Sequence, residues 1–251
     1  MLCPFLAFTA EPGTAEPGCY LKGTEFFMSD TPLRLVLFDF DGTLCDSAAT
    51  IIRLMKQACA ACDLPVPEDN FIRGNIGHGV SHAALSYADG DPVKAGQLAE
   101  AYRMIARNEY LGGQAPLDPL FDGAAEVLSD LQSKGYLTGI ITNKSRTGLH
   151  SLITRHGLDR RVDVTITADD CAVKPAPDMA MLAMRETGVD QANTVLVGDT
   201  EIDAGCAANA GIAFVGVSWG YHSPDRLTQM GAVHILRSFD ELPSIVLNQF
   251  T

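Results

Sequence analysis

The sequence is short of basic residues and contains no long uncharged apolar run. Its 251 residues include 18 Lys and Arg against 31 Asp and Glu, which gives a formal net charge of −13. Nucleic-acid binding is disfavoured, because an acidic surface repels phosphate backbones and no cluster of Lys and Arg compensates for it. No segment reaches the roughly 18 apolar residues of a membrane-spanning helix. We expect a soluble protein without nucleic-acid or membrane partners, and the charge leaves room for a small anionic ligand handled through a metal.

The cysteines show neither a disulfide framework nor a complete zinc motif. There are seven of them, an odd number, unevenly scattered in a chain that is long enough to fold around an apolar core. A reducing, cytoplasmic location fits this usage best. Cys59 and Cys62 lack the second ligand pair that a zinc site requires, so buried helix cysteines explain their spacing better.

The first residues read as a tail. Residues 9–18 repeat Thr-Ala-Glu-Pro-Gly twice, with neither helical nor strand periodicity. The apolar stretch 1–10 has no basic residue before it and no convincing cleavage site, which disfavours a secretory signal. We expect residues 1–32 to be disordered, and we hypothesise that the first 27 are dispensable and that Met28 is the functional start.

Short apolar runs and helical patterns alternate along most of the remaining chain. Strands are predicted at 33–38, 138–142, 162–167, 194–197 and 213–217, and helices at 123–134, 147–156 and 178–187, each followed by a glycine. Such alternation is typical of an α/β fold with a mostly parallel sheet and helices on both faces.

Residues 47–118 break this alternation and offer only helical spacing. Such an insertion lies beside the carboxyl end of the first strand, where open α/β sheets bind ligands. We therefore predict a discontinuous core, residues 33–46 and 119–251, and a helical cap, residues 47–118, that acts as a lid.

Acidic clusters follow two predicted strands. Asp39 and Asp41 come directly after the first strand, and Asp199 and Asp203 follow the fourth. On neighbouring parallel strands these four carboxylates would meet at one edge of the sheet. Two like charges about 4 Å apart repel by about 4 kcal/mol at an effective dielectric of about 20, so a positive group is required. Carboxylate oxygens favour Mg²⁺, and one aspartate is expected to transfer a proton and another to attack directly.

Other strand ends supply complementary groups. Lys174 precedes two prolines that fix the backbone, and it is the lysine expected to balance part of the acidic charge. Thr142 and Asn143 follow the second strand and offer a hydroxyl and an amide to phosphate oxygens. Taken singly, Lys174 would be better explained as an ordinary surface lysine, and a simple polar loop would also explain Thr142 and Asn143.

In chain order the motifs resemble the haloacid dehalogenase-like hydrolase superfamily from residue 33 onward. The first motif corresponds to Asp-Phe-Asp-Gly-Thr at 39–43, and the others correspond to Thr142, Lys174 and residues 198–203. The resemblance implies a Rossmann-like core with an inserted α-helical cap. Residues 142–144, 174–178 and 217–221 are most similar to the phosphoglycolate phosphatase group.

The resemblance also implies a role for each catalytic residue. Asp39 would take the phosphoryl group as an aspartyl phosphate, and Asp41 would protonate the leaving alkoxide and then activate water. Thr142 and Lys174 would hold the phosphoryl oxygens. An acid at position 41 argues for a phosphatase or a phosphomutase, because a leaving alkoxide needs a proton. The halide that leaves in a dehalogenase needs none.

The remaining implied residues bind metal and substrate. Mg²⁺ would be bound by Asp39, the backbone carbonyl of Asp41 and Asp199, with Asp203 as a further ligand or a neighbour of the ligands. Thr43 and Asn143 are expected at the substrate. In the cap, the glycine-rich segment 73–79 predicts contacts from Arg73, Asn75 or His78 to the non-phosphate part, although the glycines could equally just join two helices.

Together these features predict a Mg²⁺-dependent phosphatase acting on a small phosphorylated metabolite, either phosphoglycolate-like or a sugar phosphate. The alternatives are a phosphomutase of the same superfamily and, less favoured because no nucleophile or metal ligand is missing, a non-catalytic binding protein on this fold. The natural substrate and the oligomeric state, monomer or homodimer, stay open.

Overall fold

The computed structural model describes residues 32–249. Apart from Pro32, the predicted tail and the predicted start at Met28 lie outside the described residues. Within the described part of the chain, no helix is both long and apolar enough to cross a membrane.

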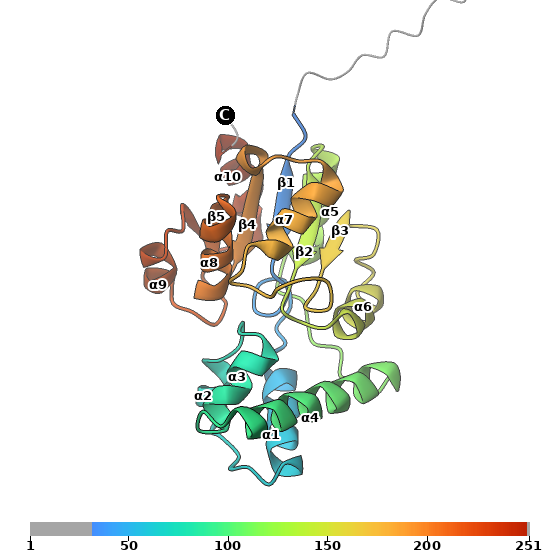
Figure 1. Ribbon diagram of the computed structural model, residues 1–251. Helices are drawn as coiled ribbons and strands as arrows, with labels where there is room; N and C mark the ends of the chain where they lie inside the picture. The colour runs from blue at the N-terminus through green and yellow to red at the C-terminus, as the bar shows by residue number, and fades with distance from the viewer. Residues whose placement is uncertain (1–31, 250–251) are drawn as a thin grey trace, which may run out of the picture. The chain divides into compact units, whose positions relative to one another are not determined.

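A six-stranded parallel sheet forms the centre of the described residues, in the order β3-β2-β1-β4-β5-β6 (Figure 1). The strands are β1 (Leu35–Phe38), β2 (Leu137–Ile141), β3 (Val164–Ile166), β4 (Thr194–Gly198), β5 (Ala213–Val217) and β6 (His234–Leu236). The α/β fold and the first five strands confirm the prediction. Strand β6 was not predicted, because three residues, two of them only half-buried, are too short a pattern to recognise.

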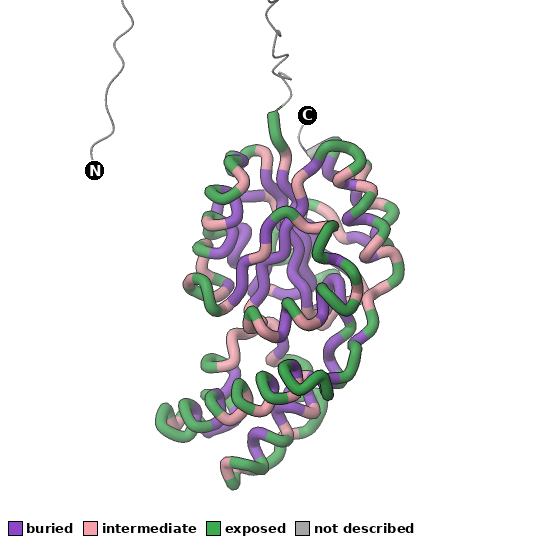
Figure 2. Tube along the Cα trace, turned by 90° about the vertical axis from the view of Figure 1, so that its right-hand side faces the viewer, coloured by how far each residue is buried: buried purple, intermediate pink, exposed green. Residues whose placement is uncertain are grey.

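Alternate side chains of the strands face two layers of helices. Leu35 and Leu37 pack on one side and Val36 and Phe38 on the other, as the period of two in a strand requires. The first layer comprises α7 (Asp178–Thr187), α8 (Glu201–Ala210) and α9 (Pro224–Gln229), and the second α5 (Ala124–Ser133), α6 (Arg146–Arg155) and α10 (Leu242–Gln249). Short 3₁₀ helices, Gln191–Asn193 and Phe239–Glu241, complete the core. Figure 2 shows the buried strands between helices with exposed outer surfaces, an arrangement in which each fully buried Leu or Phe contributes about 1.5–3 kcal/mol.

Four helices between β1 and α5 form what we call the helical insertion. They are α1 (Ala48–Ala61), α2 (Asp69–Arg73), α3 (Val80–Tyr87) and α4 (Pro92–Leu111). Asp91 is the N-cap of α4, and its carboxylate accepts hydrogen bonds from the N–H groups of Val93 and Lys94. The helices enclose a separate apolar cluster that includes Cys59 and Leu98, so Cys59 has the packing role expected for it. The same expectation is wrong for Cys62, which is only half-buried because it lies at the C-cap of α1, where the helix ends.

The chain leaves the core and returns to it at adjacent points. The Asp46 N–H donates to the Pro119 carbonyl at 2.8 Å, and the Phe121 N–H donates to the Leu44 carbonyl at 3.0 Å. The insertion is therefore attached through two neighbouring chain crossings, and β1 keeps its place in the sheet.

The edge where the site lies follows from the strand register. Phe38, the last residue of β1, pairs with Ile140 of β2 and Val197 of β4. After β1 the chain adds β2 and β3 on one side of β1, and it then adds β4, β5 and β6 on the other side. The strand order therefore reverses between β1 and β4, which is the point at which such folds bind ligands. Residues that directly follow β1, β2 and β4 therefore emerge together.

Candidate active site

Three carboxylates form a buried cluster at this edge. Asp39 follows β1, Asp199 follows β4, and Asp203 lies in the first turn of α8. Each offers an oxygen within 4.8 Å of the others, and none is more than 3% exposed. The set consists only of hard oxygen donors, which suits Mg²⁺.

Lys174 bridges two members of this cluster. Its Nζ lies 2.8 Å from Asp39 Oδ1 and 2.6 Å from Asp203 Oδ1. Burial disfavours the ammonium, but the carboxylates of Asp203 and Asp39 outweigh that effect and raise the pKa of Lys174. The lysine is therefore charged, and it compensates part of the negative charge, as its position in the sequence suggested.

One lysine leaves the cluster short of positive charge. Burial, reinforced by the nearby Asp203 carboxylate and opposed by Lys174, raises the pKa of Asp39 to about 7. Burial, followed by repulsion from Asp203 and Asp39, also raises the pKa of Asp199 well above its ordinary value. A divalent cation among these oxygens would supply the missing charge, so the residues present fit a bound Mg²⁺.

Neighbouring groups fix the orientation of Asp199. Its Oδ1 accepts the Thr43 hydroxyl at 2.8 Å, and its Oδ2 accepts the Tyr221 N–H at 2.9 Å. A Cβ at Gly220 would lie 2.1 Å from the Asp199 Cβ, so only glycine permits this approach. Thr43, expected at the substrate, thus donates its hydroxyl to a carboxylate of the cluster.

Asp203 is fixed by the start of its own helix. Its Oδ2 accepts both the hydroxyl of Thr200, at 2.6 Å, and the N–H of Thr200, at 3.0 Å. Thr200 in turn caps α8, which makes a reciprocal capping box. The carboxylate that contacts Lys174 therefore cannot rotate without disturbing the helix start.

Asp41 lies in a second arrangement with a lysine of its own. Its carboxylate accepts the Lys144 ammonium at 2.9 and 3.2 Å and the Ser47 hydroxyl at 2.6 Å. Burial disfavours the Lys144 ammonium, but Asp41 outweighs it and the pKa of Lys144 is raised. Sequence reasoning assigned neither partner a role. The signal for Lys144 was its position two residues after Thr142, at the same edge of the sheet.

The two residues after β2 also face this edge. Thr142 is buried, and its Oγ1 accepts the Lys144 N–H at 3.2 Å. The amide of Asn143 bonds the backbone of Lys174 and of Gly77. The structure thus brings together all the motif residues that the sequence placed at strand ends.

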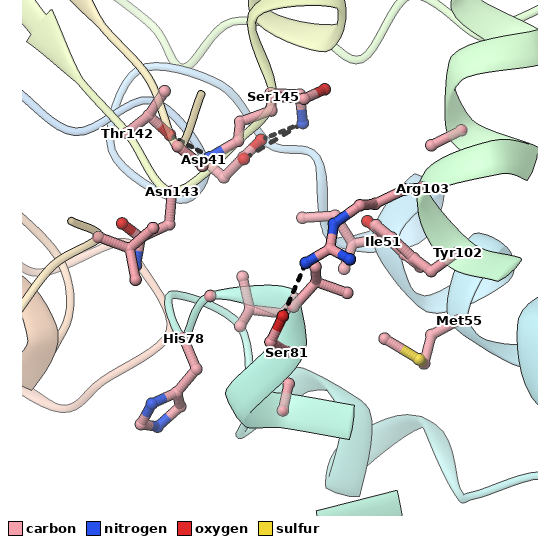
Figure 3. A pocket seen from close by; sticks show the side chains of 18 of the residues that line it. Asp41, Ile51, Met55, His78, Ser81, Tyr102, Arg103, Thr142, Asn143 and Ser145 are labelled. Atoms are coloured by element: carbon pink, nitrogen blue, oxygen red, sulfur yellow. Dashed lines mark hydrogen bonds and ion pairs between the residues drawn. The ribbon is translucent and has the colours of Figure 1, made fainter. Parts of the chain in front are cut away.

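A cavity of about 810 Å³ extends from this edge to the helical insertion. Asp41 and Thr142 lie on one side of it, and Tyr102 and Arg103 of α4 on the other (Figure 3). Arg103 donates to the Ser81 hydroxyl at 2.7 Å. Sequence reasoning missed Arg103, because helical periodicity identifies the apolar face of α4 but not which polar residues face a cavity.

The predicted cap residues separate into two groups. His78 and Asn75 line the cavity, and the His78 ring stacks on His82 with centroids 4.8 Å apart. Arg73 is not among the described residues that line it, and its guanidinium lies 6.0 Å from the centroid of the Tyr221 ring. Residues 74–79, which contain Asn75 and His78, join α2 to α3 and line the cavity, so the glycine-rich segment both connects two helices and faces the site.

The chain is similar in sequence and in fold to known hydrolases and phosphatases. A sequence model of the haloacid dehalogenase-like hydrolase family matches residues 36–217. The N-acetylmuramic acid 6-phosphate phosphatase of Pseudomonas putida is 34% identical over 202 residues, 80% of this chain and 90% of that protein. The plasmid phosphoglycolate phosphatase of Cupriavidus necator is 31% identical over 222 residues, 86% of this chain and 94% of that protein. A crystal structure from Bacteroides fragilis, described as a haloacid dehalogenase-like hydrolase, superimposes with a TM-score of 0.77 at 25% identity, covering 84% of this chain and 99% of that one.

Proposed function

The chain belongs to the haloacid dehalogenase-like hydrolase family, and we propose that it is a Mg²⁺-dependent phosphatase that hydrolyses small phosphate monoesters through an aspartyl phosphate on Asp39. It is a phosphoric monoester hydrolase of the phosphoglycolate phosphatase-like group. The observation that carries the finer proposal is the placement of Asp39. Its buried carboxylate lies 2.8 Å from Lys174 Nζ, beside two further carboxylates, on the wall of the cavity.

The carboxylates of Asp39 and Asp199 and the backbone carbonyl of Asp41 would hold Mg²⁺, with Asp203 as a further ligand or as a neighbour that orients Lys174. When bound, the cation would neutralise charge on the phosphate and on the clustered aspartates. The raised pKa values of Asp39 and Asp199 support this proposal, because burial and like charge leave both carboxylates undercompensated.

In the first step, an Asp39 oxygen attacks phosphorus while the bond from phosphorus to the alcohol oxygen breaks. Protonated Asp41 donates its proton to the departing alkoxide. The Lys174 ammonium and the Thr142 hydroxyl hold the phosphoryl oxygens as charge spreads over them.

In the second step, Asp41 takes a proton from water, and the resulting hydroxide attacks the phosphorus of the aspartyl phosphate. The bond between phosphorus and Asp39 breaks, which releases phosphate and restores both aspartates. Lys144 and Ser47, which bond the Asp41 carboxylate, orient it for both transfers.

The alcohol part of the substrate would occupy the side of the cavity formed by the helical insertion. A volume of about 810 Å³ has room for a sugar phosphate as well as for phosphoglycolate. The two phosphatases compared above act on those two kinds of ester, and we propose a substrate within that range.

We also propose the domain division 33–46 with 119–251 as the catalytic core and 47–118 as a cap that covers the substrate. The adjacent crossings at Asp46 and Pro119 and the separate apolar cluster of the insertion support it. The described cysteines are free, which supports a reducing compartment such as the cytoplasm.

The test is a panel of esters with the purified chain and Mg²⁺. The panel contains 2-phosphoglycolate, glucose 6-phosphate, N-acetylmuramic acid 6-phosphate, a nucleoside monophosphate and pyrophosphate, compared by kcat/KM for phosphate release. We expect turnover of at least one ester by the wild type and none by Asp39→Asn. Failure of every ester with a folded protein would contradict the proposal, and a sugar phosphate isomer in place of free phosphate would indicate a phosphomutase.

A further inference from the structure

The side chain of Asn143 is bonded to two segments other than its own. Its Oδ1 accepts the N–H of Lys174 at 2.9 Å. Its Nδ2 donates to the carbonyl of Lys174 at 3.0 Å and to the carbonyl of Gly77, in the helical insertion, at 2.8 Å. Both amide hydrogens are therefore used within the protein, and none is left for a substrate while these bonds hold.

Gly77 belongs to residues 74–79, which we call the docking loop. Its φ is +99°, and a Cβ there would lie 2.9 Å from Thr200 Cγ2. A Cβ at Gly79 would lie 3.1 Å from Val173 Cγ2. The loop thus packs directly on Thr200, which caps α8, and on Val173, which precedes Lys174.

These contacts connect the insertion to the supports of the catalytic lysine. Lys174 is the cation that touches Asp39 and Asp203, at 2.8 and 2.6 Å. Its backbone N–H and carbonyl are both held by Asn143, and the remaining hydrogen of the same amide is held by the docking loop. Movement of the loop therefore reaches Lys174 through one rigid, planar group.

We propose that Asn143 is a positioning residue that couples docking of this loop to the placement of Lys174. The proposal rests on the phosphatase function assigned above. When the loop is docked, the Gly77 carbonyl fixes the plane of the Asn143 amide, and the amide fixes the Lys174 backbone. When the loop withdraws, the amide loses one of its three partners and Lys174 is held less firmly at Asp39. The lysine is thus set for reaction only with the insertion closed over the cavity.

The substitution Gly77→Ala tests this coupling from the insertion side. The added Cβ would collide with Thr200 at a backbone angle that only glycine adopts readily, so the loop is displaced and its carbonyl leaves Asn143. Gly96→Ala on α4 is the matched control, because nothing lies within 4 Å of the added Cβ. Thermal unfolding verifies that both variants fold.

Amide hydrogen exchange by NMR on the full chain with Mg²⁺ gives a readout that needs no substrate. We expect Gly77→Ala to raise the exchange rate of the Lys174 amide about tenfold, and Gly96→Ala to leave it unchanged. In Asn143→Asp, the new carboxylate faces the carbonyls of Gly77 and Lys174 and cannot donate to either. Adding Gly77→Ala to that variant should therefore raise the exchange rate of the Lys174 amide no further. An unchanged Lys174 amide in Gly77→Ala would overturn the coupling, even if the enzyme hydrolyses phosphate esters.

Kinetics supply the second readout. Gly77→Ala and Asn143→Asp should each lower kcat about tenfold, and the double variant should lose no more than the worse single variant, because both break one linkage. Losses that multiply would overturn the proposal. So would a raised KM with unchanged kcat in Asn143→Asp, since that is the effect of losing a substrate contact. If the wild type hydrolyses no ester, the phosphatase proposal fails and the exchange experiment still decides the coupling.

Discussion

The aspartates on the sheet side of the cavity are buried and densely bonded, whereas Arg103 on the insertion side is half exposed and sparsely bonded. Asp199 and Asp203 are 0% exposed, and each accepts two or more hydrogen bonds from fixed neighbours. Across the cavity, the Arg103 side chain is 48% exposed, donates to Ser81 and lies 3.8 Å from Glu100. These two carboxylates, proposed to support the metal, are therefore set in place before a substrate arrives, while Arg103, which faces its alcohol part, can rearrange.

This difference separates two kinds of mutational effect. Changes on the sheet side should lower kcat for every ester, because the phosphoryl group is common to all of them. Changes on the insertion side, outside the docking loop that bonds Asn143, should act on KM and on the ranking of esters.

Asp39→Asn should reduce phosphate release at least about 10³-fold for every ester, because the amide cannot attack phosphorus. Its thermal unfolding in EDTA should match or exceed that of the wild type, since one buried like charge is removed from the cluster. Residual turnover within tenfold of the wild type would exclude Asp39 as nucleophile.

Chelation should abolish turnover, and added Mg²⁺ should restore it. Mg²⁺ at 100 times its dissociation constant should also stabilise the fold by about 2.7 kcal/mol, because the ion binds only the folded cluster. A differential unfolding experiment in EDTA and in Mg²⁺ measures both effects together. Equal turnover in the two conditions would remove the metal from the proposal.

The metal-free protein should also lose stability as the pH rises. The pKa of Asp39 is about 7 when folded and returns toward its ordinary 3.8 on unfolding. Between those values the folded chain keeps a proton that the unfolded chain releases, so this contribution is fully present below 3.8 and is lost as the pH rises through about 7. Urea unfolding in EDTA across this range measures the decline, and Asp39→Asn should show a smaller one.

Lys144→Met should lower kcat about 10- to 100-fold for all esters alike, because it removes the ammonium that orients Asp41. Lys94→Met, an exposed lysine on α4, is the control and should behave as wild type. A loss confined to a single ester would place Lys144 among the substrate contacts and weaken the distinction between the two sides.

Arg103→Gln should change kcat/KM about tenfold for esters with large or anionic alcohols, and little for small ones, because the guanidinium faces the far part of the cavity. Steady-state kinetics on the same panel provide the measurement. An equal fall in kcat for every ester would show that this side also takes part in the chemistry.

The smallest effect is expected inside the insertion. Arg53 forms a paired contact with Glu109, both N···O distances being 2.7 Å, with the two side chains 37% and 20% exposed. Arg53→Ala should cost about 1 kcal/mol or less in the free energy of unfolding and leave kcat unaltered. A large loss of turnover would mean that packing within the insertion controls the sheet side.

The sequence could predict the functional residues that directly follow the strands. Asp39 and Asp199 each follow a buried apolar run, so their convergence needed only the assumption that β1 and β4 are neighbours. The pairing of Lys144 with Asp41 spans 103 residues and depends on how the loop after β2 turns, which no local pattern records. Arg103 was missed for a related reason, because its direction depends on how α4 is rotated against the core.

The hydrogen bonds between Asp46 and Pro119 and between Leu44 and Phe121 place the two ends of the insertion side by side. A segment whose ends already meet can be exchanged for another without stretching the sheet that holds it. Replacement of the helical insertion alone would change the part of the cavity that faces the alcohol group. The sheet that carries the aspartates would stay the same. The same boundary offers protein engineers a graft point, where a foreign module with adjacent ends would meet the sheet edge that carries the buried aspartates.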